Sequence, residues 1–322
     1  MIANLAFALL TVALLAGGVF LIDRRADLRE AEAEAQFGPS GKLIDIDGTT
    51  VHALVTGAGP DLVLIHGASG NLRDFSFDLI EPLAQHYRVI ALDRPGLGWT
   101  DRLHDRGETP GEQARLLQKA ADRLGVTRPL VLGHSFGGAV ALAWALERPE
   151  ETAGLILLGA VSNPWPGGLD TLYHVNSSRL GSALVVPLIT AFAPLDRVHA
   201  ALEAIFKPQR VPVGYARHIG AGLTMRRDSL RANARQITRL RPQVVEMSEQ
   251  YHRLEMPLEI LHGEADTIVP LEIHSEPLSR QAPDADLLRM PGVGHMPHHA
   301  DPHAVIQAVH RAAARAGLRE GH

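Results

Sequence analysis

The stretch that decides the fold is Leu130-Val131-Leu132-Gly133-His134-Ser135-Phe136-Gly137-Gly138. Its first three residues are apolar and predict a buried strand, while the residues from Phe136 onward predict a helix that stops at Pro149. The G-x-S-x-G spacing around Ser135 is typical of a tight strand-to-helix turn that exposes a serine. Side chains at Gly133 and Gly137 would collide with neighbouring elements in such a turn. We therefore predict that Ser135 is a nucleophile at a helix N-terminus, where the helix dipole favours negative charge.

Short apolar runs and helical patterns alternate on both sides of this stretch. The runs that suit strands are residues 61–65, 88–92, 130–132, 155–158, 258–261 and 286–290. Because these runs are largely apolar, they fit strands that are buried on both faces, as in a parallel sheet. Thr109-Pro110-Gly111-Glu112 predicts a capping box that opens a helix ending at Gly125. The alternation predicts an α/β fold with a doubly wound, mostly parallel sheet.

Two segments depart from this alternation. Residues 43–46 and 51–55 flank Asp47-Gly48, which predicts a hairpin and therefore an antiparallel edge before the parallel strands. Residues 163–255 are rich in proline and helical patterns but poor in β-branched runs. We interpret them as a helical cap inserted between two parts of an α/β core, residues 42–162 and 256–322. Such a cap lies over the carboxyl edge of the sheet, where open α/β sheets bind ligands.

The N-terminus has a different composition from the rest of the chain. Residues 2–22 carry no charge, and as a helix they would span roughly 31 Å, the thickness of a bilayer core. We predict a single-pass transmembrane anchor in residues 1–22 and a charged linker with a solvated face in residues 23–41. The alternative is a cleaved signal peptide on an exported protein, although no Lys or Arg precedes the run and no Ala-x-Ala site lies near its end. The three arginines after the run predict that the catalytic part is cytoplasmic.

The composition excludes several classes of protein. The 322 residues contain no cysteine, which excludes a cysteine nucleophile, disulfides and thiolate metal sites. The net charge is −5 and no long basic run is present, so we predict no nucleic-acid partner. His298, His299, Asp301 and His303 lie close together but match no metal-binding spacing, and we therefore predict no metal site.

A serine hydroxyl becomes a good nucleophile only when a base takes its proton and an acid orients that base. In strand-turn-helix hydrolases the acid precedes the base along the chain. Asp266 lies in the loop after the predicted strand 258–261, with Glu264 as the competing carboxylate, and His295 lies just after the last predicted strand. We predict that His295 is the general base for Ser135 and that Asp266 orients the histidine.

The oxyanion of a tetrahedral intermediate needs N–H donors. We predict that the backbone N–H of Phe136, the residue after the nucleophile, is one donor. The second should come from the loop His66-Gly67-Ala68-Ser69-Gly70, where we favour Ala68 and keep Ser69 as the alternative. We interpret His66 as a residue that packs this loop rather than as a second base.

Residues 42–316 resemble the α/β-hydrolase superfamily. The motifs that carry the resemblance occur in the family's order: His66-Gly67, Asp93-Arg94-Pro95-Gly96-Leu97-Gly98-Trp99-Thr100, Gly133-His134-Ser135-Phe136-Gly137-Gly138, Gly263-Glu264-Ala265-Asp266-Thr267-Ile268-Val269-Pro270 and Gly292-Val293-Gly294-His295. The family's D-x-x-V-P continuation favours Asp266 over Glu264. The resemblance also implies a shaping role for residues 93–100, a cap that sets substrate choice, and ester hydrolysis without a cofactor. Haloalkane dehalogenases and epoxide hydrolases of the family use an aspartate where this chain has Ser135.

Three functions fit these residues. The leading one is a serine hydrolase that cleaves an ester or related acyl bond through an acyl-enzyme, with thioesters, amides, lactones and activated C–C bonds open to the same triad. A cap near a membrane favours a small apolar or amphipathic acyl substrate. The second is a cofactor-free perhydrolase or haloperoxidase-like enzyme. The third is a ligand-binding scaffold without turnover.

Overall fold

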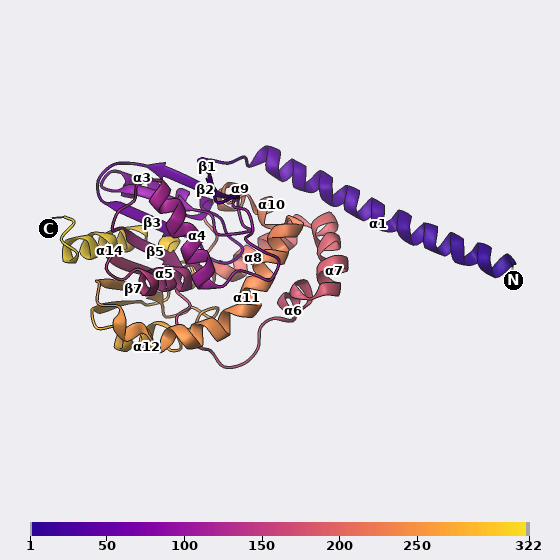
Figure 1. Ribbon diagram of the computed structural model, residues 1–322. Helices are drawn as coiled ribbons and strands as arrows, with labels where there is room; N and C mark the ends of the chain where they lie inside the picture. The colour runs from indigo at the N-terminus through magenta and orange to yellow at the C-terminus, as the bar shows by residue number, and fades with distance from the viewer. Residues whose placement is uncertain (1, 320–322) are drawn as a thin grey trace.

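The computed structural model describes residues 2–319, so the first residue of the predicted anchor and residues 320–322 of the predicted core lie outside the described residues. One sheet of eight strands runs through the body (Figure 1). The strands are β1 (Lys42–Ile46), β2 (Thr49–Thr56), β3 (Asp61–Ile65), β4 (Arg88–Leu92), β5 (Leu130–His134), β6 (Gly154–Leu158), β7 (Leu258–Gly263) and β8 (Ala285–Met290).

The strand order is β1-β2-β4-β3-β5-β6-β7-β8. The pairs β1–β2 and β2–β4 are antiparallel, and every other neighbouring pair is parallel. The first hairpin turns at Asp47 (φ 54°) and Gly48 (φ 85°), two left-handed residues whose twist matches that of the strands. The predicted doubly wound, mostly parallel sheet with an antiparallel edge is therefore confirmed.

Helices cover both faces of the sheet. They are α2 (Arg73–Ser76), α3 (Ile80–Ala84), α4 (Pro110–Arg123), α5 (Phe136–Glu147), α12 (Ser275–Gln281), α13 (Pro297–Ala300) and α14 (Pro302–Arg315). One apolar cluster joins the sheet to α4 and α5, and a second joins its other face to α2, α3 and α14. The predicted capping box opens α4, because the Thr109 side chain accepts from the Glu112 N–H and the Glu112 carboxylate accepts from the Thr109 N–H.

Residues 163–255, which we call the cap segment, contribute no strand to the sheet. They form α6 (Thr171–Ser177), α7 (Arg179–Phe192), α8 (Leu195–Phe206), α9 (Tyr215–His218), α10 (Ala221–Thr224), α11 (Arg227–Ser248) and the 3₁₀ turn η1 (Tyr251–Arg253). Asn233 and Gln236 of α11 hydrogen-bond Ser69 and the Pro95 carbonyl, which lie in the loops after β3 and β4. The cap segment therefore touches the carboxyl edge of the sheet.

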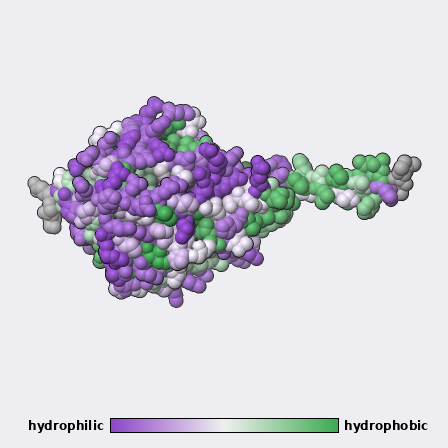
Figure 2. Space-filling model, turned by 60° about the horizontal axis from the view of Figure 1, so that its bottom comes forward, coloured by the Kyte–Doolittle hydropathy of each residue, from purple (hydrophilic) through white to green (hydrophobic). Residues whose placement is uncertain are grey.

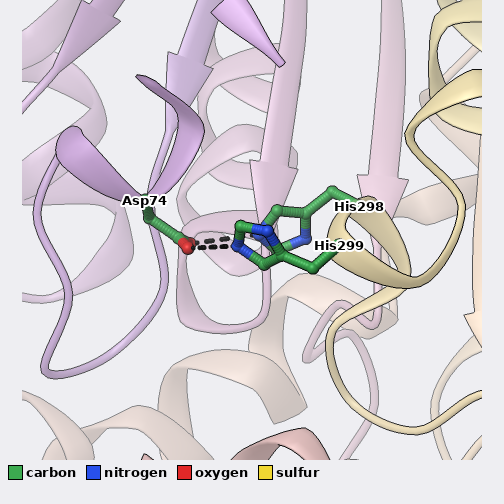
Figure 3. A group of neighbouring side chains, drawn as sticks. All are labelled: Asp74, His298 and His299. Carbon is green, nitrogen blue, oxygen red and sulfur yellow. Dashed lines mark hydrogen bonds and ion pairs between the residues drawn. The ribbon is translucent and has the colours of Figure 1, made fainter. Parts of the chain in front are cut away.

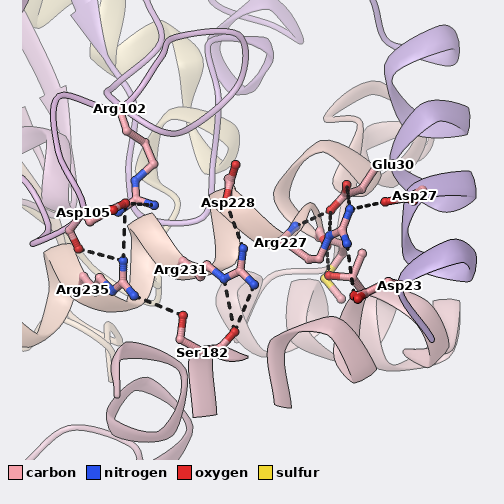
Figure 4. A network of polar contacts seen from close by, with 12 residues as sticks. Asp23, Asp27, Glu30, Arg102, Asp105, Ser182, Arg227, Asp228, Arg231 and Arg235 are labelled. Carbon is pink, nitrogen blue, oxygen red and sulfur yellow. Dashed lines mark hydrogen bonds and ion pairs between the residues drawn. The ribbon is translucent and has the colours of Figure 1, made fainter. Parts of the chain in front are cut away.

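The helix α1 (Ile2–Gln36) is unbroken and projects from the body (Figure 1). Its apolar half is long enough to cross a membrane, and none of its most apolar window is buried. The charged linker that we expected at residues 23–41 is helical through Gln36. Asp23, Asp27 and Glu30 share one face of this helix and all contact Arg227 of α11 (Figure 4). One face of the expected solvated linker is therefore an interface with the cap segment.

Candidate active site

Ser135 lies at the turn between β5 and α5 in a strained conformation, with φ 53° and ψ −119°. The two flanking glycines allow this turn because larger residues would not fit. A Cβ on Gly137 would lie 2.2 Å from the Ile65 carbonyl oxygen, and one on Gly133 would lie 2.4 Å from the Gly137 carbonyl oxygen. The packing of β5, α5 and β3 thus holds the serine at the carboxyl edge of the sheet.

The structure brings Ser135, His295 and Asp266 into one hydrogen-bonded chain. The Ser135 Oγ–H donates to His295 Nε2 at 2.9 Å, and the His295 Nδ1–H donates to Asp266 Oδ2 at 2.7 Å. The three residues are only 7%, 5% and 6% exposed. Asp266 follows β7 and His295 follows β8, so all three groups come from the carboxyl ends of parallel strands.

Asp266 is held as a carboxylate by its neighbours. Its Oδ1 accepts the backbone N–H groups of Ile268 and Val269, at 2.9 and 3.0 Å. Burial alone raises the pKa of Asp266, but hydrogen bonds from His262 and His295 outweigh burial and hold that pKa well below its usual value. The competing Glu264 is exposed. The geometry therefore favours Asp266 as the partner of the histidine.

His262 lies beside Asp266, and we assigned it no role from the sequence. Its Nε2–H donates to the Val269 carbonyl at 2.7 Å and lies 3.3 Å from Asp266 Oδ2. Its Nδ1 is 2.6 Å from Ser275 Oγ. The ring therefore braces the loop that carries Asp266. A histidine four residues before the acid was the signal in the sequence that could have found it.

The loop that carries His295 is fastened to the cap segment. A Cβ on Gly294 would lie 1.9 Å from the Lys207 carbonyl oxygen, so only glycine permits this approach. The Gly294 N–H donates to Gln209 Oε1 at 2.9 Å, and the Gln209 side chain donates to the Gly292 carbonyl at 2.8 Å. On the other side, His134 Nε2–H donates to the His295 carbonyl at 2.9 Å. These contacts fix the position of the imidazole.

The loop after β3 lies directly beside the serine, since a Cβ on Gly67 would be 3.2 Å from the Ser135 Cβ. The Ser69 N–H donates to Asn233 Oδ1 at 2.8 Å, while Asn233 Nδ2 donates to Ser69 Oγ at 2.8 Å. By contrast, the Ala68 N–H has no acceptor among residues 2–319. The Phe136 N–H, at the first helical position, has no partner within its own helix. The geometry therefore favours the Ala68 N–H over the Ser69 N–H as the second oxyanion donor beside the Phe136 N–H.

A buried cation lies behind these two donors. Arg94 is fully buried; its guanidinium lies 4.2 Å from the centre of the Phe136 ring and donates to the Gly67 carbonyl at 3.1 Å. Burial lowers the pKa of Arg94 to about 9. His66 donates through Nδ1 to the Gly67 carbonyl and accepts the Arg94 backbone N–H at Nε2. Burial, with help from Arg94, lowers the pKa of His66 to about 4, which fits a neutral packing residue.

A second cluster of polar side chains lies near the triad and contains Asp74, His298 and His299 (Figure 3). The Nε2 atoms of His298 and His299 lie 3.2 and 2.9 Å from the two Asp74 oxygens, and the Tyr215 hydroxyl donates to Oδ1 at 2.8 Å. We predicted no metal here, and the three side chains are close enough to hold one. Each carboxylate oxygen already accepts a hydrogen bond, while the buried Nδ1 of His298 has no hydrogen-bond partner among the described residues.

Comparison with known proteins adds a second line of evidence. A family model described as the alpha/beta hydrolase fold matches residues 60–183. The dihydrolipoyllysine-residue acetyltransferase component of the acetoin cleaving system of Cupriavidus necator is 36% identical over 42% of this chain and 35% of that protein. This chain thus spans little more than a third of that relative. A candidate non-heme haloperoxidase of Mycobacterium phage D29 is 29% identical over 71% of this chain and 80% of that protein.

Solved structures resemble the whole body. The esterase RhEst1 of Rhodococcus sp. ECU1013 superposes with a TM-score of 0.67 and 22% identity, over 87% of this chain and 98% of that chain. A bacterial membrane phospholipase A superposes with a TM-score of 0.67 and 22% identity, over 99% of this chain and 100% of that chain. At these identities the likeness shows the fold.

Proposed function

The chain belongs to the α/β-hydrolase superfamily, and from this premise we propose that it is a serine hydrolase that cleaves an ester or related acyl bond. The observation that carries the proposal is the hydrogen-bonded chain from Ser135 through His295 to Asp266, at 2.9 and 2.7 Å. An imidazole in this position can take the serine proton, and the carboxylate fixes its tautomer. The esterase RhEst1 among the solved structures shares the fold that holds these residues.

In the first step the Ser135 oxygen attacks the carbonyl carbon of the substrate while its proton passes to His295 Nε2. Asp266 stabilises the imidazolium that forms. The Phe136 and Ala68 N–H groups donate to the oxyanion of the tetrahedral intermediate. The intermediate collapses when the C–O bond to the leaving alcohol breaks and the alcohol takes the proton from His295, which leaves an acyl-Ser135 ester.

In the second step a water molecule gives a proton to His295 and attacks the acyl-enzyme. The same two N–H groups stabilise the second tetrahedral intermediate, and Ser135 leaves with the proton that His295 held. The product is the free carboxylic acid, and the enzyme is regenerated. These steps use only protein side chains, backbone N–H groups and water, so we propose no cofactor.

We propose that α1 anchors the protein in a membrane and that the catalytic body lies on the cytoplasmic side. The supports are the uncharged run of residues 2–22, the exposure of this run in the structure, and the arginines that follow it. Cleavage of α1 as a signal peptide is the alternative that mass spectrometry of the mature protein tests. A body held at a membrane favours small apolar or amphipathic acyl substrates.

A covalent serine-directed probe tests the proposed nucleophile. We expect a fluorophosphonate to label the wild type and not Ser135→Ala, while Ser229→Ala, which changes another buried serine, keeps labelling. p-Nitrophenyl esters of increasing acyl length then report the preferred chain. Labelling of Ser135→Ala would contradict the assignment, and a folded wild type that reacts with neither probe nor ester would favour the scaffold function.

A perhydrolase or haloperoxidase-like activity is the second candidate, favoured by the similarity to the phage D29 protein. Hydrogen peroxide would replace water in the attack on the acyl-enzyme, and the peracid released would oxidise a halide. Peroxide-dependent bromination in the presence of a carboxylic ester, lost in Ser135→Ala, would favour this activity. Ester hydrolysis without bromination would favour the first candidate.

A further inference from the structure

The helix α7 carries an exposed apolar stripe. Leu180, Leu184, Leu188 and Phe192 recur at every fourth position and are 75%, 60%, 43% and 53% exposed. The helix packs against α1, α6 and α11, and its buried residues are Gly181, Ser182, Val186, Pro187, Thr190 and Ala191. Figure 2 shows hydrophobic surface on the body beside the base of α1, and α7 is the helix that packs most closely against α1. Aligned large apolar side chains of this kind mark an interaction surface.

Contacts with Arg25 and Arg29 of α1 hold the C-terminal end of this stripe beside the segment of α1 that follows its apolar run. Arg25 donates to the Ala191 carbonyl at 2.8 Å and its guanidinium lies 5.1 Å from the centre of the Phe192 ring. Arg29 donates to the Ala193 carbonyl at 2.9 Å. The apolar run of α1 ends just before Asp23. The Phe192 end of the stripe therefore lies within about one helical turn of the place where α1 would leave a bilayer.

The bend between α6 and α7 fits a helix that lies on a membrane better than a pair that crosses one. Taken together, α6 and α7 are apolar enough to pass as a membrane-crossing segment, but they bend by 106° where they meet. In a lipid core such a bend would leave backbone groups without partners, so the pair does not fit a crossing helix. A helix that packs one side on the protein body and exposes an apolar face lies instead at the boundary of headgroups and acyl chains.

The neighbouring face of α7 borders a cationic cavity of about 780 Å³. Its lining is Arg102, Asp105, Arg106, Ser177, Arg179, Ser182, Ala183, Asp228, Arg231, Arg235 and Thr238. Arg231 donates to the Ser182 carbonyl and Arg235 to the Ser182 hydroxyl, which ties α11 to α7 (Figure 4). Among residues 2–319, Arg106 and Arg179 form no ion pair. Five guanidinium groups against two carboxylates give the cavity an excess positive charge, which suits phosphate groups.

We propose that α7 lies in the headgroup region of the bilayer that α1 spans, with its apolar stripe toward the acyl chains and the arginine cavity on the phosphates of anionic lipids. This inference rests on the proposed role of α1 as an anchor. It places the cap segment, through α11, between the lipid surface and the oxyanion loop that Asn233 holds. The occupant of the surface is therefore the lipid bilayer itself.

Depth-dependent fluorescence quenching tests the position of α7. The chain has no cysteine, so Leu184→Cys, Leu14→Cys and Leu288→Cys can each carry a single NBD label on the full-length protein. Leu288 is an exposed leucine of the edge strand β8, far from α1 in sequence, and serves as the matched control. In phosphatidylglycerol vesicles with nitroxide-labelled acyl chains, we expect quenching at position 184 to exceed that at position 288 at least threefold. Equal quenching at 184 and 288 would overturn the proposal.

The label at position 14 distinguishes a failure of the proposal for α7 from a failure of the proposed α1 anchor. Quenching at 14 without quenching at 184 shows an anchored protein whose α7 stays in water, while quenching at neither refutes both. A second arm tests the cavity by replacing phosphatidylglycerol with phosphatidylcholine. We expect quenching at 184 to fall at least twofold, and we expect Arg106→Gln/Arg179→Gln to remove this difference. Equal quenching in the two lipids would refute the assignment of the cavity to anionic headgroups.

Discussion

Asn233 offers a sharp test of how the cap segment supports catalysis. It accepts from the Ser69 N–H and donates to the Ser69 hydroxyl, both at 2.8 Å, and so holds a residue with φ 56° next to the proposed donor Ala68. Leucine at position 233 has a similar volume but neither of these hydrogen bonds. We therefore expect Asn233→Leu to let the loop relax and to move the Ala68 N–H away from the oxyanion.

The size of the effect follows from the two contacts. Two hydrogen bonds of about 1 kcal/mol each hold the loop, so their loss removes about 2 kcal/mol of preference for the catalytic position. At about 1.4 kcal/mol per factor of ten, this lowers kcat by roughly 30-fold. Complete loss of one oxyanion donor, on the order of 100- to 1,000-fold, sets the upper limit. Because the contact to the oxyanion forms in the transition state, kcat and kcat/KM should fall together.

Steady-state hydrolysis of the best p-nitrophenyl ester measures this effect. Asn176→Leu is the matched control, because Asn176 is a buried asparagine of α6 whose Oδ1 has no hydrogen-bond partner among the described residues. We expect kcat to fall in Asn233→Leu and not in the control, with similar changes in Tm. An unchanged kcat in folded Asn233→Leu would refute the role of Asn233 in positioning the donor.

Three further predictions follow from single contacts. Asp266→Asn should lower kcat by roughly 10,000-fold with little loss of Tm, because the histidine loses its orienting acceptor; a drop below tenfold would contradict the triad. Gly294→Ala should lower kcat/KM by roughly 100-fold, since its Cβ meets the Lys207 carbonyl at 1.9 Å and displaces His295, and a fully active variant would refute this. The pKa of Glu112 is lowered to about 2 because hydrogen bonds from Thr109 and His104 outweigh burial. A lowered pKa stabilises the fold above about pH 4.5 and ceases to do so as the pH falls towards 2, so urea unfolding should show a cost of Glu112→Gln at pH 7 that shrinks at pH 3.

Local signals in the sequence predicted much of this structure. Asp47-Gly48 fixes a hairpin within four residues, and the Thr109–Glu112 pair fixes a helix start, because both depend on contacts between near neighbours. The positions of Ser135, Asp266 and His295 at strand ends could also be predicted from the sequence. Apolar runs mark the strands, and the carboxyl ends of parallel strands lie at one edge of the sheet.

Contacts between segments that are far apart in the sequence could not be predicted from such local signals. Asn233 and Ser69 are 164 residues apart, and Gln209 reaches Gly294 across 85 residues. No periodicity links such positions, because their approach depends on how the whole cap segment packs. The same is true of Arg227, whose three carboxylate partners lie in a segment that we expected to be solvated.

The ion pairs between Arg227 and the carboxylates of α1 have a mechanical consequence. Because α1 is a single rigid helix that is clamped to α11 by ion pairs, it lacks a hinge between its apolar half and the body. A transmembrane helix answers a thinner bilayer by tilting. If α1 spans a bilayer as proposed, such a tilt would rotate the whole body against the lipid surface, and membrane thickness would set the orientation of the enzyme.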